Sequence, residues 1–469
     1  GLELVWDDGT RVRLGDVVVP ITPREGGNYD FTARLPARYE FSAAAGGPSQ
    51  VVSVGETRVA GTWSAGSALL TGLEAVLREV ALANVDGAPP LLSIAALDLR
   101  QTLSEGTAGS WRGSLQAELS GIQGGAVGAA TGEAIAIDRL DVVAHFEDVS
   151  ARDWVELSGQ RGLFASDEAT PRAPTVRLGA ELGLAGLAFE GPPAQAANIG
   201  ESRLRLDLAR KEKGLWDIGA DFILSELSTS GLEGGEDVTI GEITARSQSA
   251  DFPLAAWREM TEQFGIGLGG GAPAPSETRR QEFAAAMADV RWGSSDSEFS
   301  AAGVRFGPAT APQFTLDRGS FRAGFDGREA LVNARYGLGA EGLFVADSEL
   351  PQELLPRAAS IELTLQDLPA SALVLPMVGA LAGEGDGDAL MGVLLGEALA
   401  GETPPSLAFD AIRYDAQAVG VSGSGRVAAD PETPGGFRGE FDTGLRDLAG
   451  LEGFVAAAAR DGAAWAQGP

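Results

Sequence analysis

The sequence predicts a mainly β protein with a few helices, built as two duplicated antiparallel β-sheet units that are elongated or groove-like. Apolar and polar residues alternate with a period of two over many segments, which is typical of strands with one buried face. The 65 glycines and 24 prolines divide the chain into short segments, as turns do between antiparallel strands. One strand pattern also recurs at a long and nearly constant spacing.

Alternation begins near the start of the chain. In Arg11–Ile21, Val12 and Leu14 alternate with Arg11 and Arg13, and the next strand carries Tyr29, Phe31, Ala33 and Leu35 on one face. Further segments with this alternation are Ile94–Leu103, Trp111–Leu119, Ile135–Phe146, Val176–Phe189, Leu204–Leu208, Leu215–Leu224, Phe314–Phe325, Ala330–Leu338, Ser360–Leu365, Leu407–Val427 and Phe437–Phe441. So many short strands joined by glycine-rich turns favour antiparallel sheets.

Helical periodicity appears in fewer places. Ala68–Ala83 has apolar residues at helical spacing, which predicts a helix near 68–83; they are Leu69, Leu70, Leu73, Val76, Leu77 and Val80. We also expect helices over Leu254–Phe264, Glu277–Arg291 and Leu448–Ala466. Two apolar segments, Pro369–Ala382 and Ala389–Ala400, predict a helical hairpin.

A chain of 469 residues is too long for one hydrophobic core. The segment 265–276 is rich in glycine and proline, so we interpret it as a linker. The first β-rich unit then covers 1–264, and the second covers 277–469 and includes the apolar hairpin 369–400.

The recurring pattern is a hydrophobic strand followed by a polar residue and then leucine or valine. Its register marks are Val149, Leu227, Leu368 and Leu448, separated by 78, 141 and 80 residues. The first and third marks differ by 219 and the second and fourth by 221. This spacing predicts an internal duplication of about 220 residues, and chance matching among degenerate strand patterns is the alternative.

Composition excludes several classes of function. The chain has no cysteine, one histidine and 66 acidic residues, with a net charge of −31. Disulfide scaffolds, zinc fingers and cysteine-dependent enzymes are therefore excluded. A chain this acidic repels phosphate backbones, so we expect no nucleic-acid partner. No apolar run reaches the roughly 18 residues that span a bilayer, which predicts no transmembrane segment in this chain.

Sequence patterns nominate no catalytic residue. His145 is the only histidine and falls in a predicted strand, where we interpret it as a half-buried structural side chain. No Gly-x-Ser-x-Gly stands at a strand-to-helix junction. Among 66 acids, no rule selects a catalytic carboxylate pair. We therefore expect a protein that is not an enzyme and has no cofactor.

Two features remain as candidate sites. Glu384, Asp386 and Asp388 alternate with glycine, an oxygen-rich pattern that calcium favours. Ala389 stands where an EF-hand loop requires glycine, so capping of a helix by Asp386 and Asp388 is the simpler interpretation and calcium the weaker one. The hairpin is apolar nearly all round, so it packs within the fold or contacts a ligand or partner. Its candidate contacts are Leu373, Met377, Leu381, Leu390, Met391 and Leu394.

The phrases Arg11–Pro20, Phe252–Phe264 and Leu407–Val427, with the acidic, Gly/Ala-rich texture, resemble an uncharacterised family of alphaproteobacterial envelope proteins. That domain-of-unknown-function family is distantly similar to AsmA-like and YdgA-like periplasmic β-repeat proteins. The resemblance implies a periplasmic or cell-envelope location and carries no catalytic residues. Because such proteins usually begin with a signal peptide or anchor and this chain begins at Gly1, we expect the export segment to have been removed.

The resulting hypothesis is a non-enzymatic periplasmic or envelope β-repeat protein that binds a lipid or another apolar ligand in a sheet groove. The alternative is a structural or partner-binding module of an envelope complex, which docks another envelope protein through sheet edges or the hairpin.

Overall fold

The protein is described here from a computed structural model. It describes most residues between 2 and 460; the longest segments outside that description are 126–133, 151–175, 255–290 and 370–404. The chain divides into two units, each described by itself. Unit 1 comprises residues 1–209 and 220–242, and unit 2 comprises 210–219 and 243–469. The linker expected at 265–276 lies outside the described residues.

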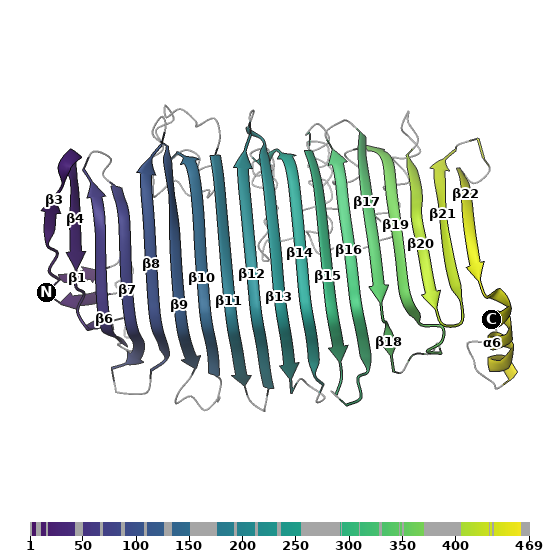
Figure 1. Ribbon diagram of the computed structural model, residues 1–469, viewed down its shortest axis with the longest axis horizontal. Coiled ribbons are helices and arrows are strands. Elements are labelled where there is room, and N and C mark those ends of the chain that lie inside the picture. Colours follow the sequence, from purple (N-terminus) through teal and green to yellow (C-terminus); the bar gives the residue numbers. More distant parts are fainter. Residues whose placement is uncertain are drawn as a thin grey trace. The chain divides into compact units, whose positions relative to one another are not determined.

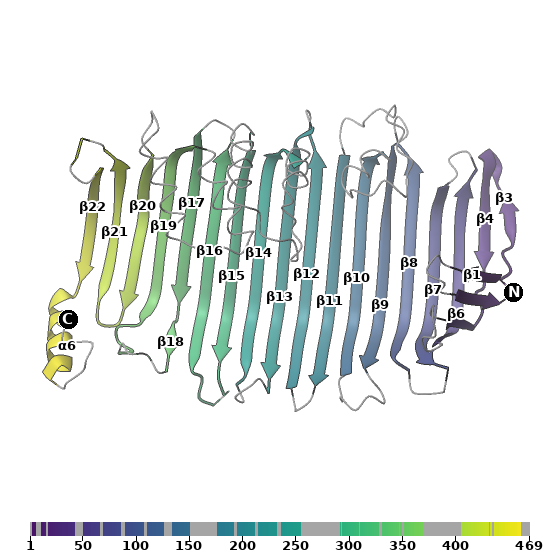
Figure 2. The same ribbon diagram turned by 180° about the vertical axis from the view of Figure 1, so that it is seen from behind.

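Unit 1 is an open antiparallel sheet of long, sequentially paired strands. Its central strands are β6 (Gln50–Ser64), β7 (Leu69–Asn84), β8 (Leu92–Glu105), β9 (Trp111–Gly125), β10 (Ala134–Val149) and β11 (Val176–Gly191). Each pairs with its neighbour in the sequence. The main parts of β12 (Gln195–Arg210) and β13 (Trp216–Ser230) follow in the same order. Figures 1 and 2 show these strands side by side from both directions.

The amino-terminal strands of unit 1 are shorter. They are β1 (Leu2–Val5), β2 (Arg11–Gly15), β3 (Ile21–Pro23), β4 (Asn28–Ala33) and β5 (Arg38–Ser42), with a 3-10 turn η1 (Glu25–Gly27) before β4. Both β4 and β5 pair with β6. β3 then pairs with β4, while β2 pairs with β5 and β1 with β2. This edge of the sheet is therefore made of split, short strands.

Unit 2 is also an open antiparallel sheet. Its strands are the main part of β14 (Val238–Phe252), β15 (Gly293–Phe306), β16 (Phe314–Gly327), β17 (Leu331–Glu341), β18 (Phe344–Val345), β19 (Pro356–Pro369), β20 (Ser406–Ala416), β21 (Gly420–Ala429) and β22 (Phe437–Arg446). Pairing runs β15–β16–β17–β19–β20–β21–β22, with β18 beside β16. Helix α6 (Leu448–Arg460) follows β22 and begins where the sequence predicts it.

The mainly β, antiparallel prediction is confirmed, and every alternating segment from Ile94–Leu103 onward falls on strands. Strands β6, β14 and β15 were not predicted. β14 and β15 are rich in serine, and their hydroxyls bond across the pair: Thr244 with Ser300 at 2.7 Å, Ser247 with Ser297 at 2.9 Å and Ser249 with Ser295 at 3.1 Å. Small polar side chains thus replace the apolar alternation by which strands are recognised.

The helix expected near 68–83 is wrong. Residues Leu69–Asn84 form strand β7, paired on both sides with β6 and β8. The misleading signal is the three-residue step from Leu77 to Val80, which resembles helical spacing. Glu79 lies within that step and has a left-handed backbone, with φ of 52°. The change of backbone direction there shifts the apolar alternation by one residue, so period alone could not separate strand from helix.

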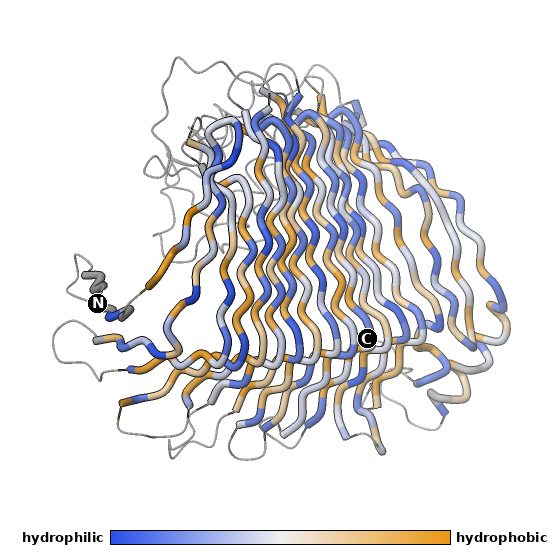
Figure 3. The backbone as a smooth tube through the Cα atoms, turned by 60° about the vertical axis from the view of Figure 1, so that its left-hand side comes forward, coloured by the Kyte–Doolittle hydropathy of each residue, from blue (hydrophilic) through white to orange (hydrophobic). Residues whose placement is uncertain are grey.

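Glu79 belongs to a transverse line of residues that we call the kink row. Pairing on either side keeps one register, so the row members face one another across six strands: Gly55, Glu79, Ala95, Gly121, Asp138 and Gly186. Glu79, Gly121 and Gly186, on alternate strands, have positive φ. Gly200 on β12 and Glu226 on β13 repeat the pairing, with φ of 58° at Glu226. Figure 3 shows the strands changing direction towards one end.

Unit 2 has its own kink row. Gly303 on β15 faces Asp317 on β16, Gly342 directly follows β17 and lies beside Asp317, and both glycines have positive φ, 65° and 64°. A Cβ at Gly342 would lie 2.1 Å from Oδ2 of Asp317. The row is therefore a repeated device in which a small residue accommodates the side chain opposite it.

Many of the buried side chains lie near strand ends. In unit 1 they include Val149 and Val176, and in unit 2 Trp216, Val332 and Leu368. Trp216 is 0 % exposed, and the Arg210 guanidinium lies 6.0 Å from its ring centroid. Most described residues in the middle of the strands remain partly exposed. A single sheet layer thus leaves much apolar surface without a partner among the described residues.

Candidate ligand-binding face

One face of the unit 2 sheet carries aligned apolar side chains, and we call it the apolar face. Register places Phe299, Phe321, Leu338, Ile361 and Ile412 opposite one another on five neighbouring strands. Neighbouring strands lie about 4.8 Å apart, so this row runs roughly 19 Å across the sheet. It is an unbroken apolar strip.

A second row lies on the same face, two residues further along most strands and three along β20, where Asp410 is an extra residue in the pairing with β19. Its members are Ala323, Tyr336, Leu363, Phe409, Gly425 and Phe441. The Phe409 and Phe441 rings lie 5.4 Å apart, between strands β20 and β22. They meet across Gly425, where a Cβ would stand 2.3 Å from Cδ1 of Phe441. The missing side chain at Gly425 lets the two rings touch.

The apolar face is exposed despite its composition. Leu338 is 56 % exposed, Phe441 54 % and Leu445 58 %. Four further aromatic residues on the same face are also exposed: Phe299, Phe321, Tyr336 and Phe437. The apolar surroundings raise the pKa of the Tyr336 hydroxyl through loss of hydration. Large contiguous apolar surfaces of this kind mark binding sites on soluble proteins.

The opposite face of the unit 2 sheet is polar. Arg322 Nη2 lies 2.9 Å from Glu298 Oε1, and Asp415 makes ion pairs with both Arg413 and Arg446. The Arg446 guanidinium, followed by that of Arg413, lowers the pKa of Asp415. Period-two alternation therefore separates an apolar face from an ion-paired one, as in a sheet with one solvated side. Figure 3 shows this alternation along the strands.

Unit 1 repeats the arrangement. Five leucines face one another on strands β7 to β11: Leu77, Leu97, Leu119, Leu140 and Leu184. Beyond the kink row a second line contains Val54, Val80, Ile94, Ile122, Ile137 and Leu187. Arg78 and Arg139 lie between these two apolar rows and form ion pairs. Arg78 Nη1 lies 2.9 Å from Oδ2 of Asp98, and Arg139 Nε lies 2.7 Å from Oδ2 of Asp141. Both units thus carry apolar rows that cross several strands.

Acidic residues with left-handed backbones mark several strand ends. Among the described residues, the non-glycine positions with positive φ are all acidic: Glu79, Asp148, Glu226, Asp251, Asp367 and Asp447. Four of them directly precede the register marks Val149, Leu227, Leu368 and Leu448. The recurring sequence pattern therefore marks a left-handed acidic residue. This residue lies at a strand end in three cases and within β13, at Glu226, in the fourth. The duplication of about 220 residues stays a prediction.

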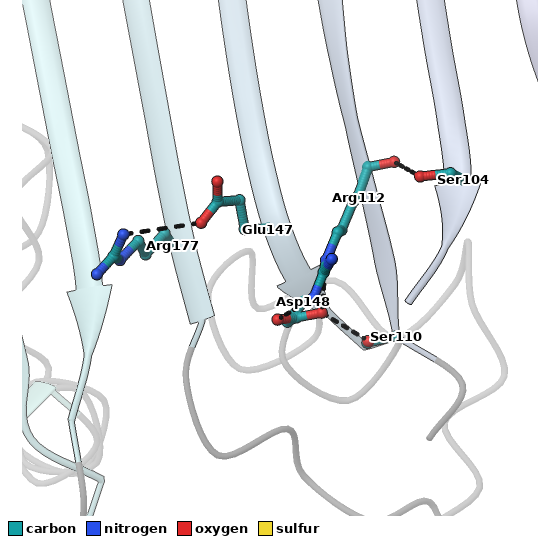
Figure 4. Close-up of polar contacts among 6 residues, drawn as sticks. All are labelled: Ser104, Ser110, Arg112, Glu147, Asp148 and Arg177. Carbon is teal, nitrogen blue, oxygen red and sulfur yellow. Dashed lines mark hydrogen bonds and ion pairs between the residues drawn. The ribbon is translucent and has the colours of Figure 1, made fainter. Parts of the chain in front are cut away.

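Figure 4 shows one of these strand ends, at Asp148. Arg112 donates from Nε to Oδ1 at 3.0 Å and from Nη2 to Oδ2 at 3.1 Å, and Ser110 Oγ donates to Oδ1 at 3.3 Å. These bonds, Arg112 first, lower the pKa of Asp148. Nearby, Oε2 of Glu147 lies 3.8 Å from Nη1 of Arg177. Every group has a partner of opposite charge or polarity, so this cluster holds strands β9 and β10 together.

In unit 2 a similar cluster surrounds Lys211. Its Nζ lies 2.7 Å from Oδ1 of Asp217 and 3.1 Å from Oδ1 of Asp251. The backbone N–H of Asp251 also donates to Asp217 Oδ1 at 3.2 Å. Similarly, the N–H of Asp367 donates to Oδ1 of Asn333 at 3.2 Å. Side chains on the neighbouring strand thus stabilise the left-handed aspartates.

His145 lies on β10 and is exposed, contrary to the half-buried side chain expected. Its cross-strand neighbours are Ser114 and Gly179, which are too small to cover an imidazole. The strand position itself agrees with the sequence. Among the described residues, no hydrogen bond or ion pair joins His145 to a nucleophile or a carboxylate, so no triad is found there.

The other sequence candidates lie outside the described residues. They are the possible calcium ligands Glu384, Asp386 and Asp388, and the hairpin contacts Leu373, Met377, Leu381, Leu390, Met391 and Leu394. Within the described part of the chain, no group of three or more acidic or histidine side chains is placed to hold a metal ion. The described helices include none with the length and apolar character needed to cross a bilayer.

In comparisons with known proteins, no family model, no curated protein and no solved structure matches the chain. The site therefore has to be interpreted from its own chemistry. Sequence reasoning named none of the apolar-face residues as ligand contacts. The available signal was the period-two spacing of Phe437, Phe441 and Leu445, but which strands those residues face depends on pairing across distant segments.

Proposed function

We propose that this protein is a non-enzymatic binder of acyl chains or other elongated apolar ligands, which lie on the apolar faces of its sheets. The observation that carries the proposal is the exposure of aligned apolar rows, with Leu338, Phe441 and Leu445 each more than half exposed. Binding sites for apolar ligands consist mainly of such side chains with few polar groups.

The shape of the apolar rows indicates an elongated, flexible ligand. Five aligned side chains, from Phe299 to Ile412, form a strip rather than a closed pocket. A flexible acyl chain can follow a strip, whereas a rigid ring system would contact only part of it. The polar face, with Arg322 ion-paired to Glu298, offers no comparable surface.

The expected affinity is modest. An acyl chain lying on an open face buries about half of its surface, so each methylene contributes about 0.4 kcal/mol, half the value for full burial. About 14 methylenes then contribute roughly 6 kcal/mol, which corresponds to a dissociation constant of tens of micromolar.

The proposal also covers the cellular location of the protein. We place the protein in the periplasm or cell envelope, and the support is the resemblance of its sequence texture to envelope β-repeat proteins. A removed signal peptide belongs to the same proposal.

The alternative is a structural or partner-binding module of an envelope complex. The same exposed apolar face favours it, because such surfaces also form protein interfaces. A protein partner would bury the face whatever its acyl-chain affinity. Chain-length dependence of ligand binding therefore separates the two functions.

The test is displacement of a fluorescent apolar probe by neutral alkyl maltosides with chains of about 8, 10 and 12 carbons, each below the concentration at which it forms micelles. Neutral ligands remove the repulsion that the net charge of −31 would exert on fatty acid anions. We expect the affinity to rise about fifteenfold for each four added methylenes. Affinity that does not change with chain length would contradict acyl-chain binding.

A further inference from the structure

Strand β22 ends the unit 2 sheet with an open edge. It pairs with β21 on one side, and no pairing to its other side is found among the described residues. All ten of its residues, Phe437–Arg446, are exposed. Figure 1 shows α6 leaving from one end of the strand. An edge of this length presents a row of unpaired backbone donors and acceptors, which is a template for a further strand.

The amino-terminal edge of unit 1 is built differently. Its outer strands are β1, with four residues, and β3, with three. β3 ends in Pro23 and is preceded by Pro20, and proline cannot donate to a ladder. Short strands and proline are the usual protection of an edge against pairing. β22 has neither, and it contains no proline.

The apolar face continues onto β22. Phe441 lies opposite Gly425, Leu445 opposite Val421 and Gly439 opposite Val427. The row that begins at Ala323 therefore reaches the open edge at Phe441, which is 54 % exposed. The row that begins at Phe299 reaches it at Thr443, and Leu445, 58 % exposed, lies on the same face. A strand added to β22 would bury these side chains against its own apolar residues.

We propose that the added strand is β22 of a second copy of this chain, antiparallel and centred on Thr443. In that register Thr443 faces Thr443 of the second copy. Glu440 then faces Arg446, and Phe441 faces Leu445, each twice by symmetry. Opposite charges, threonine pairs and aromatic–aliphatic pairs are all favourable across antiparallel strands. The interface is isologous and closes after two copies.

Other registers fit less well. Centring on Phe441 sets Glu440 against Asp442 twice, and centring on Asp442 sets that carboxylate against itself and Arg438 against Arg446. Like charges directly opposite destabilise a strand pair. Centring on Gly439 avoids repulsion but pairs only the five strand residues 437–441, compared with seven, 440–446, in the Thr443 register. The strand sequence itself thus selects the second copy and its register.

The absence of cysteine makes a direct test available. Thr443→Cys would place one thiol opposite its own copy, where facing Cβ atoms in antiparallel pairs lie about 4.5–5.5 Å apart. That is near the separation of a disulfide. Arg438→Cys is the matched control, because it is equally on β22 but faces the start of α6 in the proposed register.

We expect mild oxidation to cross-link Thr443→Cys at least tenfold faster than Arg438→Cys, and sedimentation of the unchanged chain to show a dimer. Glu440→Lys, which sets like charges against Arg446, should shift the chain towards monomer while its circular dichroism stays unchanged. The proposal is overturned if the unchanged chain is monomeric at tens of micromolar, if it forms open-ended oligomers, or if both cysteine variants cross-link at one rate. These outcomes do not depend on acyl-chain binding.

Discussion

The carboxylate of Asp138 lies over the backbone of Gly186 on the neighbouring strand, in the space that a side chain at Gly186 would occupy. A Cβ built there would stand 2.1 Å from Oδ2 and 2.5 Å from Cγ of Asp138, and Gly186 has φ of 63°. Gly342 and Asp317 repeat this relationship in unit 2. This pair explains the kink row: glycine on one strand leaves room for the side chain of the residue opposite it on the neighbouring strand.

Gly186→Ala should therefore destabilise the protein by about 2 kcal/mol or more, because it combines a left-handed alanine with a clash. Gly183→Ala is the control on the same strand, where a Cβ would lie 3.6 Å from Asp141 at ordinary contact distance. We expect the control to change the free energy of unfolding, measured in urea, by less than about 1 kcal/mol. Equal losses from both substitutions would show that the kink row has no special requirement.

Glu79→Gly should have the opposite sign. A non-glycine residue with φ of 52° carries a conformational cost of about 1–2 kcal/mol that glycine does not. Subtracting the greater entropy loss of glycine leaves a net stabilisation of roughly 0.5–1 kcal/mol. Glu74→Gly, elsewhere on β7, should instead destabilise by about 1 kcal/mol. Urea unfolding of both variants measures the difference, and a loss of stability at both positions would rule out strain at Glu79.

Asp148→Asn should reduce the sensitivity of stability to acid. Hydrogen bonds from Arg112 lower the pKa of Asp148 in the folded chain, so the unfolded chain binds its proton first as pH falls. The contribution of the carboxylate is complete above its unfolded pKa of about 3.9 and is lost as pH falls through the folded pKa.

The variant should be less stable than the unchanged chain at pH 7, and the two should converge below about pH 4. Asparagine tolerates a left-handed backbone, so the φ of 54° is retained and only the charge is removed. Urea titrations between neutral and acidic pH measure the gap. A gap that stays constant with pH would mean that the ion pair with Arg112 does not stabilise the fold.

Local sequence patterns predicted much of the fold. The alternating segments such as Trp111–Leu119 and Phe314–Phe325 predicted β9 and β16 because one face of each strand is apolar. β7 was misread because Glu79 shifts the phase of its alternation, and β14 and β15 were missed because Ser247 and Ser297 bond to each other in place of apolar contact.

The candidate site was harder to predict. The apolar face exists only once strand pairing aligns Phe299 with Phe321, 22 residues apart, and Phe321 with Leu338, 17 residues apart. Periodicity within one strand does not give that alignment. The same holds for the kink row, since Asp138 and Gly186 are 48 positions apart. The sequence instead nominated the apolar hairpin 369–400 as the ligand or partner contact, because its composition is visible in a single continuous segment.

Face-selective loss of acyl-chain binding tests the central proposal most directly. Leu338→Glu places a carboxylate in the middle of the apolar face, and Arg335→Glu places the same residue on the same strand but on the polar face. With a neutral dodecyl maltoside as ligand, below the concentration at which it forms micelles, we expect Leu338→Glu to weaken binding at least tenfold, about 1.4 kcal/mol, and Arg335→Glu to leave it within twofold. Equal affinities in the two variants and the unchanged chain would show that acyl chains do not bind on this face.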